Sequence, residues 1–133
     1  VPSEISLKKL LMVAAFSIAA STQAFADSQI IHDSTHSDAL GRSIPMYVYL
    51  PDGYQTAKEP YPVIYMLHGA ESKEDSWVDR GGIKVTADNL IARKQLRPSV
   101  IVMPTTGPQT WYVDGNADKA ETAILKDLLP FVC

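Results

Sequence analysis

The chain has 133 residues, of which 46% are hydrophobic and 20% are charged, and its formal net charge is −3. This balance fits a globular domain and excludes a basic nucleic-acid-binding protein, because no cluster of lysine and arginine occurs in the sequence. The single cysteine, Cys133, excludes an intramolecular disulfide framework and a cysteine-based metal cluster.

Residues 1–26 have the layout of a secretory signal peptide. Two lysines precede an apolar core at 10–20 that is too short to span a bilayer comfortably, and alanines stand at the −3 and −1 positions before Asp27. A buried N-terminal helix is the alternative. We expect cleavage before Asp27, a secreted or periplasmic location, and no stable membrane association after cleavage.

Residues 28–54 predict two strands around a turn at 39–41. Apolar side chains alternate with others in the second strand, which is typical of a strand with one buried face. These apolar positions are Ile44, Met46, Val48 and Leu50. Pro45 has no N–H to donate, so we expect its nitrogen side to face an edge of the sheet.

Two later segments, 63–69 and 99–105, are apolar on both faces, as in parallel strands that helices cover on each side. Between them, residues 83–96 carry apolar side chains at helical spacing: Ile83, Ala87, Leu90 and Ile91. Strand, helix and strand in this order predict a crossover, and therefore an α/β fold with a mostly parallel sheet flanked by helices.

A last helix is expected to begin at Asp118, the predicted N-cap, with Glu121 three residues later in a capping-box arrangement. Its apolar stripe is Ile124, Leu125, Leu128 and Leu129. Pro130 is expected to bend or end it. A further strand normally follows such a helix, so we interpret residues 27–133 as the N-terminal half of an α/β domain.

The carboxyl ends of the strands are where ligands bind in open α/β sheets. His68-Gly69-Ala70 and the segment 104–107 both follow predicted strands. A glycine directly after a buried strand lets the backbone turn and expose its next N–H groups, which suit a developing oxyanion. On this interpretation the Ala70 N–H is the working group and His68 holds the turn. A tight turn with a hydrogen-bonded histidine is the alternative.

Five segments in order resemble one family: RSIPMYVYLPDGY (42–54), YPVIYMLHGAESKEDSW (61–77), IVMPTTG (101–107), WYVDG (111–115) and LLPFV (128–132). The chain resembles the α/β-hydrolase superfamily and, within it, the N-terminal half of the putative-esterase family. That family includes feruloyl and acetylxylan esterases, formylglutathione hydrolases and mycolyltransferase antigens. The resemblance covers essentially all of 40–132 and implies an α/β-hydrolase fold.

The resemblance also implies a serine carboxylesterase. In that mechanism a serine on a Gly-x-Ser-x-Gly elbow attacks the ester, with a histidine as base and an acid that orients it. Ala70 matches the family's oxyanion donor in the loop after the strand that ends in His68-Gly69. His68 and Gly69 support the position of its backbone N–H. The resemblance places Trp77, Trp111, Tyr112 and Asp114 along the substrate pocket, although these aromatic residues could instead be packed loop residues.

One feature departs from the family. The sequence contains no Gly-x-Ser-x-Gly, and in the superfamily the serine, acid and histidine come in that order after the point where this chain ends. Nucleophile, acid and base are therefore absent, and His32, His36 and His68 are not assigned as the base. We interpret the chain as truncated before the nucleophile elbow and expect it to be inactive alone.

The expected parent reaction is hydrolysis of a carboxylic ester, either a small ester or an acyl group on a plant polysaccharide. One alternative is an inactive truncated product or a carbohydrate-binding remnant, and another is an acyltransferase that shares the acyl-enzyme. No metal or organic cofactor is implied. For His32 and His36 we favour a surface location over a metal site, because the sequence offers no evident third ligand.

Overall fold

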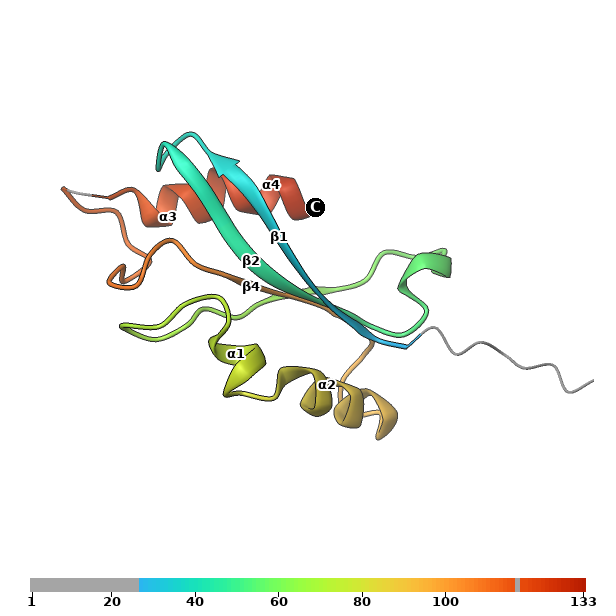
Figure 1. Cartoon of the computed structure of the whole chain (residues 1–133). Coiled ribbons are helices and arrows are strands. Elements are labelled where there is room, and N and C mark those ends of the chain that lie inside the picture. The colour runs from blue at the N-terminus through green and yellow to red at the C-terminus, as the bar shows by residue number, and fades with distance from the viewer. Residues whose placement is uncertain (1–26, 117) are drawn as a thin grey trace, which may run out of the picture.

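The computed structural model describes residues 27–116 and 118–133, so the predicted signal peptide lies outside the described residues. The elements in chain order are β1 (Gln29–Ser37), β2 (Arg42–Leu50), η2 (Tyr54–Thr56), β3 (Val63–Tyr65), α1 (Ser76–Asp79), α2 (Ile83–Ala92), β4 (Val100–Pro104), α3 (Ala120–Thr122), η3 (Ala123–Leu128) and α4 (Leu129–Val132). The described strands form a four-stranded sheet in the order β1-β2-β4-β3. Figure 1 shows α1 and α2 on one side of this sheet and the C-terminal helices on the other.

β1 and β2 form the predicted hairpin and pair antiparallel along their full lengths. The turn lies where the sequence predicts it, and the Gly41 N–H donates to the Ser37 carbonyl at 2.9 Å. Gly41 has a φ of +65°, which glycine adopts without the steric cost of a side chain. Ile44, Met46 and Val48 are buried on one face, as the alternation predicts. Leu50 is only half-buried, and Tyr49 is buried on the opposite face, so the strand is not exposed along the whole of that face.

The surroundings of Pro45 correct one expectation. β2 is an internal strand with β1 on one side and β4 on the other, so neither side of it is an edge. The β2–β4 ladder ends at Met46 opposite Pro104. Pro45 lies just beyond, where its carbonyl accepts the Thr105 N–H at 3.0 Å. A proline is tolerated at that position because the paired ladder needs no donor from it.

β3 and β4 pair in parallel and are connected through α1 and α2, which confirms the predicted crossover and the α/β class. All residues of β4 are buried, as expected for a strand covered on both faces. β3 is shorter than the predicted 63–69 and is half-buried at an edge of the described sheet. The described sheet is mixed rather than mostly parallel, since the other two strand pairs are antiparallel.

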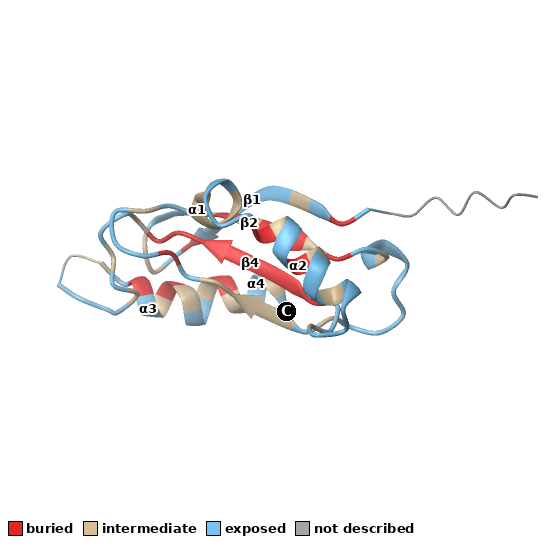
Figure 2. Cartoon of the chain, turned by 90° about the horizontal axis from the view of Figure 1, so that it is seen from below, coloured by how far each residue is buried: buried red, intermediate tan, exposed pale blue. Residues whose placement is uncertain are grey.

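Two apolar clusters hold helices to the opposite faces of the sheet. The first joins β2 and β4 to η3 and consists of Ile44, Met46, Val48, Val100, Val102, Ala123 and Leu128. The second joins the same strands to α2 and consists of Tyr49, Ile83, Ala87, Ile101 and Met103. Each large apolar side chain buried in this way contributes about 1.5–3 kcal/mol. Figure 2 shows β4 buried between the two layers.

The start of the C-terminal helix differs from the prediction. The helix begins at Ala120. The Asp118 carboxylate accepts the Lys119 N–H at 2.9 Å and an N–H of Arg42 at 3.0 Å, but it bonds to no described N–H within the helix. Asp114 takes the capping role instead, because its Oδ1 accepts the Thr122 N–H at 2.9 Å. A bridge between Asp114 and Lys119 folds the preceding loop back and brings this carboxylate over the helix.

Pro130 does not end the helix, which continues to Val132. The α-helical turn of α3 widens into π-helical turns in η3, and α4 follows directly with Pro130 as its second residue. The wider turns shift the phase of the buried side, so Leu125, predicted to face the core, is 52% exposed. Within the described residues, no helix has the length and apolar character needed to cross a membrane.

Candidate active site

Two loops meet at the carboxyl ends of β3 and β4. Because these strands are parallel and adjacent, the segment 66–72 and the segment 105–112 leave the sheet at the same end. Hydrogen bonds join them at several points, and one of these is the Glu71 N–H to the Pro108 carbonyl at 2.7 Å. The site predicted around His68 therefore has a second wall, formed by the loop after β4.

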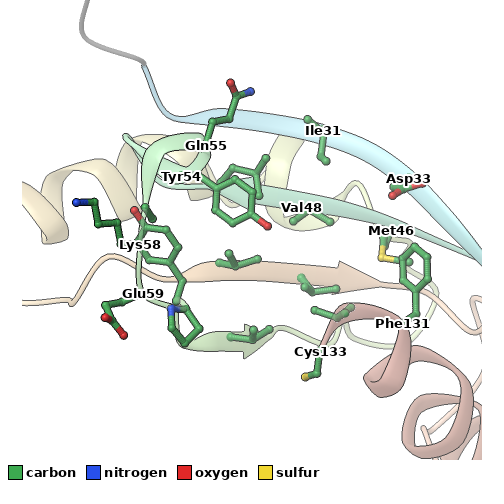
Figure 3. Close-up of a pocket in the computed structure, with 18 residues that line it drawn as sticks. Ile31, Asp33, Met46, Val48, Tyr54, Gln55, Lys58, Glu59, Phe131 and Cys133 are labelled. Carbon is green, nitrogen blue, oxygen red and sulfur yellow. The ribbon is translucent and has the colours of Figure 1, made fainter.

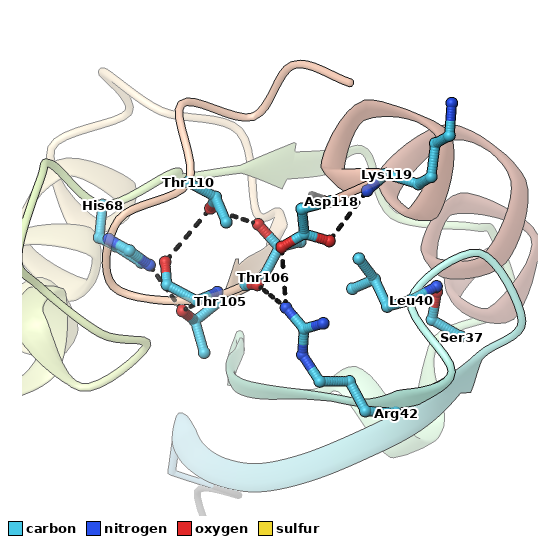
Figure 4. A network of polar contacts seen from close by, with 10 residues as sticks. Ser37, Leu40, Arg42, His68, Thr105, Thr106, Thr110, Asp118 and Lys119 are labelled. Carbon is cyan, nitrogen blue, oxygen red and sulfur yellow. Dashed lines mark hydrogen bonds and ion pairs between the residues drawn. The ribbon is translucent and has the colours of Figure 1, made fainter. Parts of the chain in front are cut away.

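His68 is the centre of these contacts. Its side chain is buried, and Nδ1 lies 2.7 Å from the Gly69 carbonyl while Nε2 lies 2.7 Å from the Thr105 hydroxyl (Figure 4). A carbonyl oxygen only accepts, so Nδ1 carries the proton in a neutral ring and Nε2 accepts from Thr105. The Thr105 oxygen in turn accepts the Gly107 N–H at 3.1 Å. The imidazole thus ties the first loop to the second.

The Thr105–His68 pair has the spacing of a nucleophile and its base, with the Gly69 carbonyl as a third, orienting group. The two residues are only 8% and 6% exposed, respectively, which leaves a substrate no access to the hydroxyl. The pair therefore acts as a connection between loops.

Ala70 lies at the exposed tip of the first loop. Its N–H and that of Gly69 have no hydrogen-bond acceptor among residues 27–116 and 118–133, whereas the N–H groups of His68 and Glu71, which flank this pair, are both bonded. Glu71 has a φ of +56°, so the strained backbone position is here and not at Gly69. A Cβ on Gly69 would meet no described atom within 4 Å. We predicted that Gly69 is needed because it lets the backbone turn after the strand. That reason is wrong, because the residue with the positive φ in this turn is Glu71.

Tyr112 contacts the predicted site directly. Its hydroxyl oxygen accepts the His68 N–H at 3.3 Å, and the two rings meet edge to face with centroids 5.5 Å apart. Burial raises the pKa of Tyr112 to about 12, with the His68 N–H acting in the opposite direction. The phenol consequently stays neutral over the ordinary pH range.

The two tryptophans differ. The Trp77 indole N–H donates to the Leu67 carbonyl at 3.3 Å, and its ring packs against the apolar cluster of α2. Trp77 is thus a packing residue beneath the first loop. Trp111 is 79% exposed, and its ring is open to a ligand from solution.

Asp114, predicted to line the pocket, is occupied elsewhere. Both of its oxygens bond to Thr122, one to the N–H and one to the hydroxyl. The hydroxyl bond and the N–H bond from Thr122 hold the pKa of this carboxyl below its usual value. Both carboxylate oxygens of Asp114 are therefore engaged by Thr122, and no hydrogen bond among the described residues joins Asp114 to His68 or Tyr112.

Sequence reasoning placed Thr105 and Thr106 in the segment 104–107 at the ligand-binding end of the sheet, but it did not predict the contacts that brace this second loop. Arg42 Nη2 donates to the Thr106 carbonyl and pairs with Asp118 at 3.0 Å, and the hydroxyls of Thr106 and Thr110 lie 2.7 Å apart (Figure 4). The available signal was the position of Thr105 and Thr106 at the carboxyl end of a buried strand. Arg42 offered no such signal, because its partners lie 64 and 76 residues away.

A further hollow lies elsewhere, on the sheet face that bears the first apolar cluster. It has a volume of about 800 Å³, and its floor is formed by Met46, Val48, Val100 and Val102. In Figure 3 the η2 loop with Tyr54 and Lys58 borders it on one side, and Phe131 and Cys133 border it on another. The residues predicted for the site do not line it, so we do not place the chemistry there.

Other polar groups are arranged as surface pairs. His32 Nε2 lies 3.7 Å from Glu74 and His36 Nε2 lies 3.5 Å from Asp38, with both imidazoles mostly exposed. Arg80 Nη2 donates to the hydroxyls of Ser72 and Ser76, at 3.3 Å each. In the described part of the chain, neither serine bonds to a histidine or a carboxylate, so neither is activated as a nucleophile.

Comparison with known proteins finds relatives of one family. A family model described as Putative esterase matches residues 37–132. An endo-1,4-beta-xylanase/feruloyl esterase of Xylanibacter ruminicola is 31% identical over 105 residues, which cover 72% of this chain and 14% of that protein. An esterase of Mycobacterium tuberculosis is 31% identical over 112 residues, which cover 80% of this chain and 23% of that protein.

A solved structure of a ferulic acid esterase superposes with a TM-score of 0.76 and 29% sequence identity. The match covers 81% of this chain and 44% of that one. The chain therefore spans less than half the length of each of these relatives. The matched region contains both loops described above.

Proposed function

The chain belongs to the putative-esterase family and has the α/β-hydrolase fold, and on this premise we propose that it serves the hydrolysis of carboxylic esters by a serine mechanism. In this proposal the described residues supply one oxyanion donor, the Ala70 N–H, and one wall of the substrate site. The nucleophile, acid and base are supplied by residues outside these 133, because the sequence has no Gly-x-Ser-x-Gly.

The exposed N–H of Ala70 is the observation that carries the proposal. It and the Gly69 N–H have no acceptor among the described residues, although the N–H groups of His68 and Glu71 that flank this pair are bonded, and it lies at the end of the sheet where α/β enzymes bind ligands. A fixed N–H aimed at the developing negative charge stabilises the tetrahedral intermediate of acyl transfer more than the ester itself. The buried His68–Thr105 contact supports such a fixed placement.

We propose an acyl group on plant polysaccharide as the substrate. Two of the relatives are named as feruloyl or ferulic acid esterases, and the exposed Trp111 offers an aromatic face on the loop beside Ala70. Secretion through the signal-peptide pattern at 1–26 agrees with a substrate outside the cell. N-terminal sequencing of the exported protein should start at Asp27, and retention of residues 1–26 would contradict the secretion part.

A turnover assay tests the assignment of roles. Purified 27–133 is expected to hydrolyse neither 4-nitrophenyl acetate nor methyl ferulate, because it contains no Gly-x-Ser-x-Gly serine. Turnover that a phosphonate blocks would show a nucleophile within these residues and overturn the proposed division of roles. Binding to insoluble xylan without hydrolysis, lost on Trp111→Ala, would favour a carbohydrate-binding role instead.

The DNA that follows the codon for Cys133 tests the serine mechanism itself. We expect an open frame to continue within about 30 codons into a Gly-x-Ser-x-Gly elbow, followed by an acid and then a histidine. A stop codon with no such elbow in any frame would contradict the mechanism for this protein.

A further inference from the structure

Hydrogen bonds from the loop after β4 surround the two consecutive N–H groups of Gly69 and Ala70. On one side, the Tyr112 hydroxyl oxygen accepts the His68 N–H at 3.3 Å, and the Thr105 hydroxyl lies 2.7 Å from Nε2 of the His68 ring. On the other side, the Pro108 carbonyl accepts the Glu71 N–H at 2.7 Å. The Gly69 and Ala70 N–H groups between these contacts have no acceptor among the described residues.

We propose that Tyr112 and Thr105 are positioning residues that hold His68, and through it the oxyanion-donor turn at Gly69 and Ala70. This inference rests on the proposed function for its meaning, because a fixed turn matters only where the N–H groups meet a developing charge. It reassigns Tyr112, whose hydroxyl is engaged with the backbone of the turn instead of being offered to a substrate.

The two residues act on different parts of His68. Tyr112 accepts from the backbone N–H, so it fixes where the chain leaves β3. Thr105 donates to Nε2 and thereby keeps the ring proton on Nδ1, where it bonds to the Gly69 carbonyl. The direction of the Gly69 carbonyl sets the plane of the peptide that carries the Ala70 N–H. The ring tautomer and the direction of the oxyanion donor are therefore linked.

The experiment is solution NMR on ¹⁵N-labelled 27–133, the mature protein expected after cleavage, without any ester. Long-range ¹H–¹⁵N spectra of the imidazole report the tautomer of His68, and we expect the proton on Nδ1 in the unaltered protein. A neutral His68 with its proton on Nε2 would overturn the proposal before any variant is made.

Two variants separate the roles. Tyr112→Phe keeps the ring against His68 but removes the acceptor, so the His68 amide should exchange about tenfold faster and the Gly69 and Ala70 amide resonances should shift. Thr105→Val removes the donor to Nε2, so the ring should become a mixture of tautomers, and Thr105→Ser should restore the single tautomer.

Tyr54→Phe is the matched control, because Tyr54 lies in η2 and its hydroxyl has no hydrogen bond among the described residues. It should leave His68, Gly69 and Ala70 unchanged. Folded Tyr112→Phe protein with unchanged exchange at His68, or Thr105→Val with an unchanged tautomer, would overturn the proposal. These signals do not depend on turnover, so a failure of the esterase assignment would leave them in place.

Discussion

Gly81 lies closer to a neighbouring backbone than any residue with a side chain can. A Cβ at this position would stand 2.8 Å from the Trp77 carbonyl oxygen and 3.1 Å from its Cα. Backbone cannot swing aside as a flexible side chain does, so we expect Gly81→Ala to lower the free energy of unfolding by about 1–3 kcal/mol. Urea unfolding followed by tryptophan fluorescence measures this change.

Gly115→Ala is the control for this prediction. A Cβ on Gly115 would meet no described atom within 4 Å, so the alanine should change stability by less than about 1 kcal/mol. Equal losses in the two variants would show that contact with the Trp77 backbone is not the cause of the loss at Gly81.

Individual site residues differ in how well the sequence could reveal them. His68 and Ala70 follow an apolar run and could be predicted, since the end of a strand is a local property. Thr105 could have been found by the same rule at the end of β4. The capping contact of Asp114 could not, because its partner Thr122 is eight residues away and depends on how the loop folds back.

At the scale of elements, a polar contact joins the hairpin to the C-terminal helix. The buried Ser37 hydroxyl donates to the Asp127 carboxylate and accepts the Leu40 N–H at 3.1 Å. The same carboxylate accepts the Ala39 N–H at 3.1 Å, and these bonds hold the pKa of Asp127 below its usual value. One serine thus anchors both the β1–β2 turn and η3.

We expect Ser37→Ala to cost about 1–3 kcal/mol of unfolding free energy, because it removes a buried hydrogen bond to a charged group. Amide exchange at Ala39 and Leu40 should accelerate more than exchange in β4. Ser34→Ala, at an exposed position of β1, should be near neutral. Unchanged exchange at the turn in Ser37→Ala would contradict the anchoring role.

The bounds of strands and helices agree with the sequence-based predictions where the apolar pattern is clear. They differ from the predictions where tertiary contacts determine where an element ends. β4 and the start of α2 at Ile83 were predictable, because their apolar patterns are continuous. β3 ends early, because the chain turns away to meet the loop after β4. The π-helical turns before Pro130 bury Ala123 beside the predicted Leu128 and leave Leu125 exposed, and nothing in local propensity indicates that change.

For the whole molecule, the titrating groups define a window of stability. Burial, the largest effect for each, raises the pKa of Tyr49, Tyr65 and Tyr112 above the ordinary value of 10.0, to about 12 for the last two. Burial alone would raise the pKa of Asp88, but hydrogen bonds from Ser28, Lys84 and Tyr49 outweigh it and leave it below 3.8. The pKa values of Asp114 and Asp127 are also lowered below the ordinary value.

The signs follow from which state releases protons first. Above pH 10.0 the unfolded chain ionises its tyrosines while the folded protein keeps them neutral, so stability falls as the pH rises toward 12. Below pH 3.8 the unfolded chain takes up protons on aspartates that the folded protein keeps ionised, so stability falls again. Urea midpoints should therefore be nearly constant between these limits.

Tyr65 allows the alkaline limit to be tested by a single substitution. Its hydroxyl is buried without a hydrogen-bond partner in the described part of the chain, so Tyr65→Phe removes a group that the folded state does not satisfy. At neutral pH the variant should be as stable as the unaltered protein or more stable by about 1 kcal/mol. Between pH 10.0 and 12 it should lose less stability, because one of the raised pKa values is gone. Parallel urea midpoints for the two proteins across that range would show that Tyr65 does not contribute to the alkaline limit.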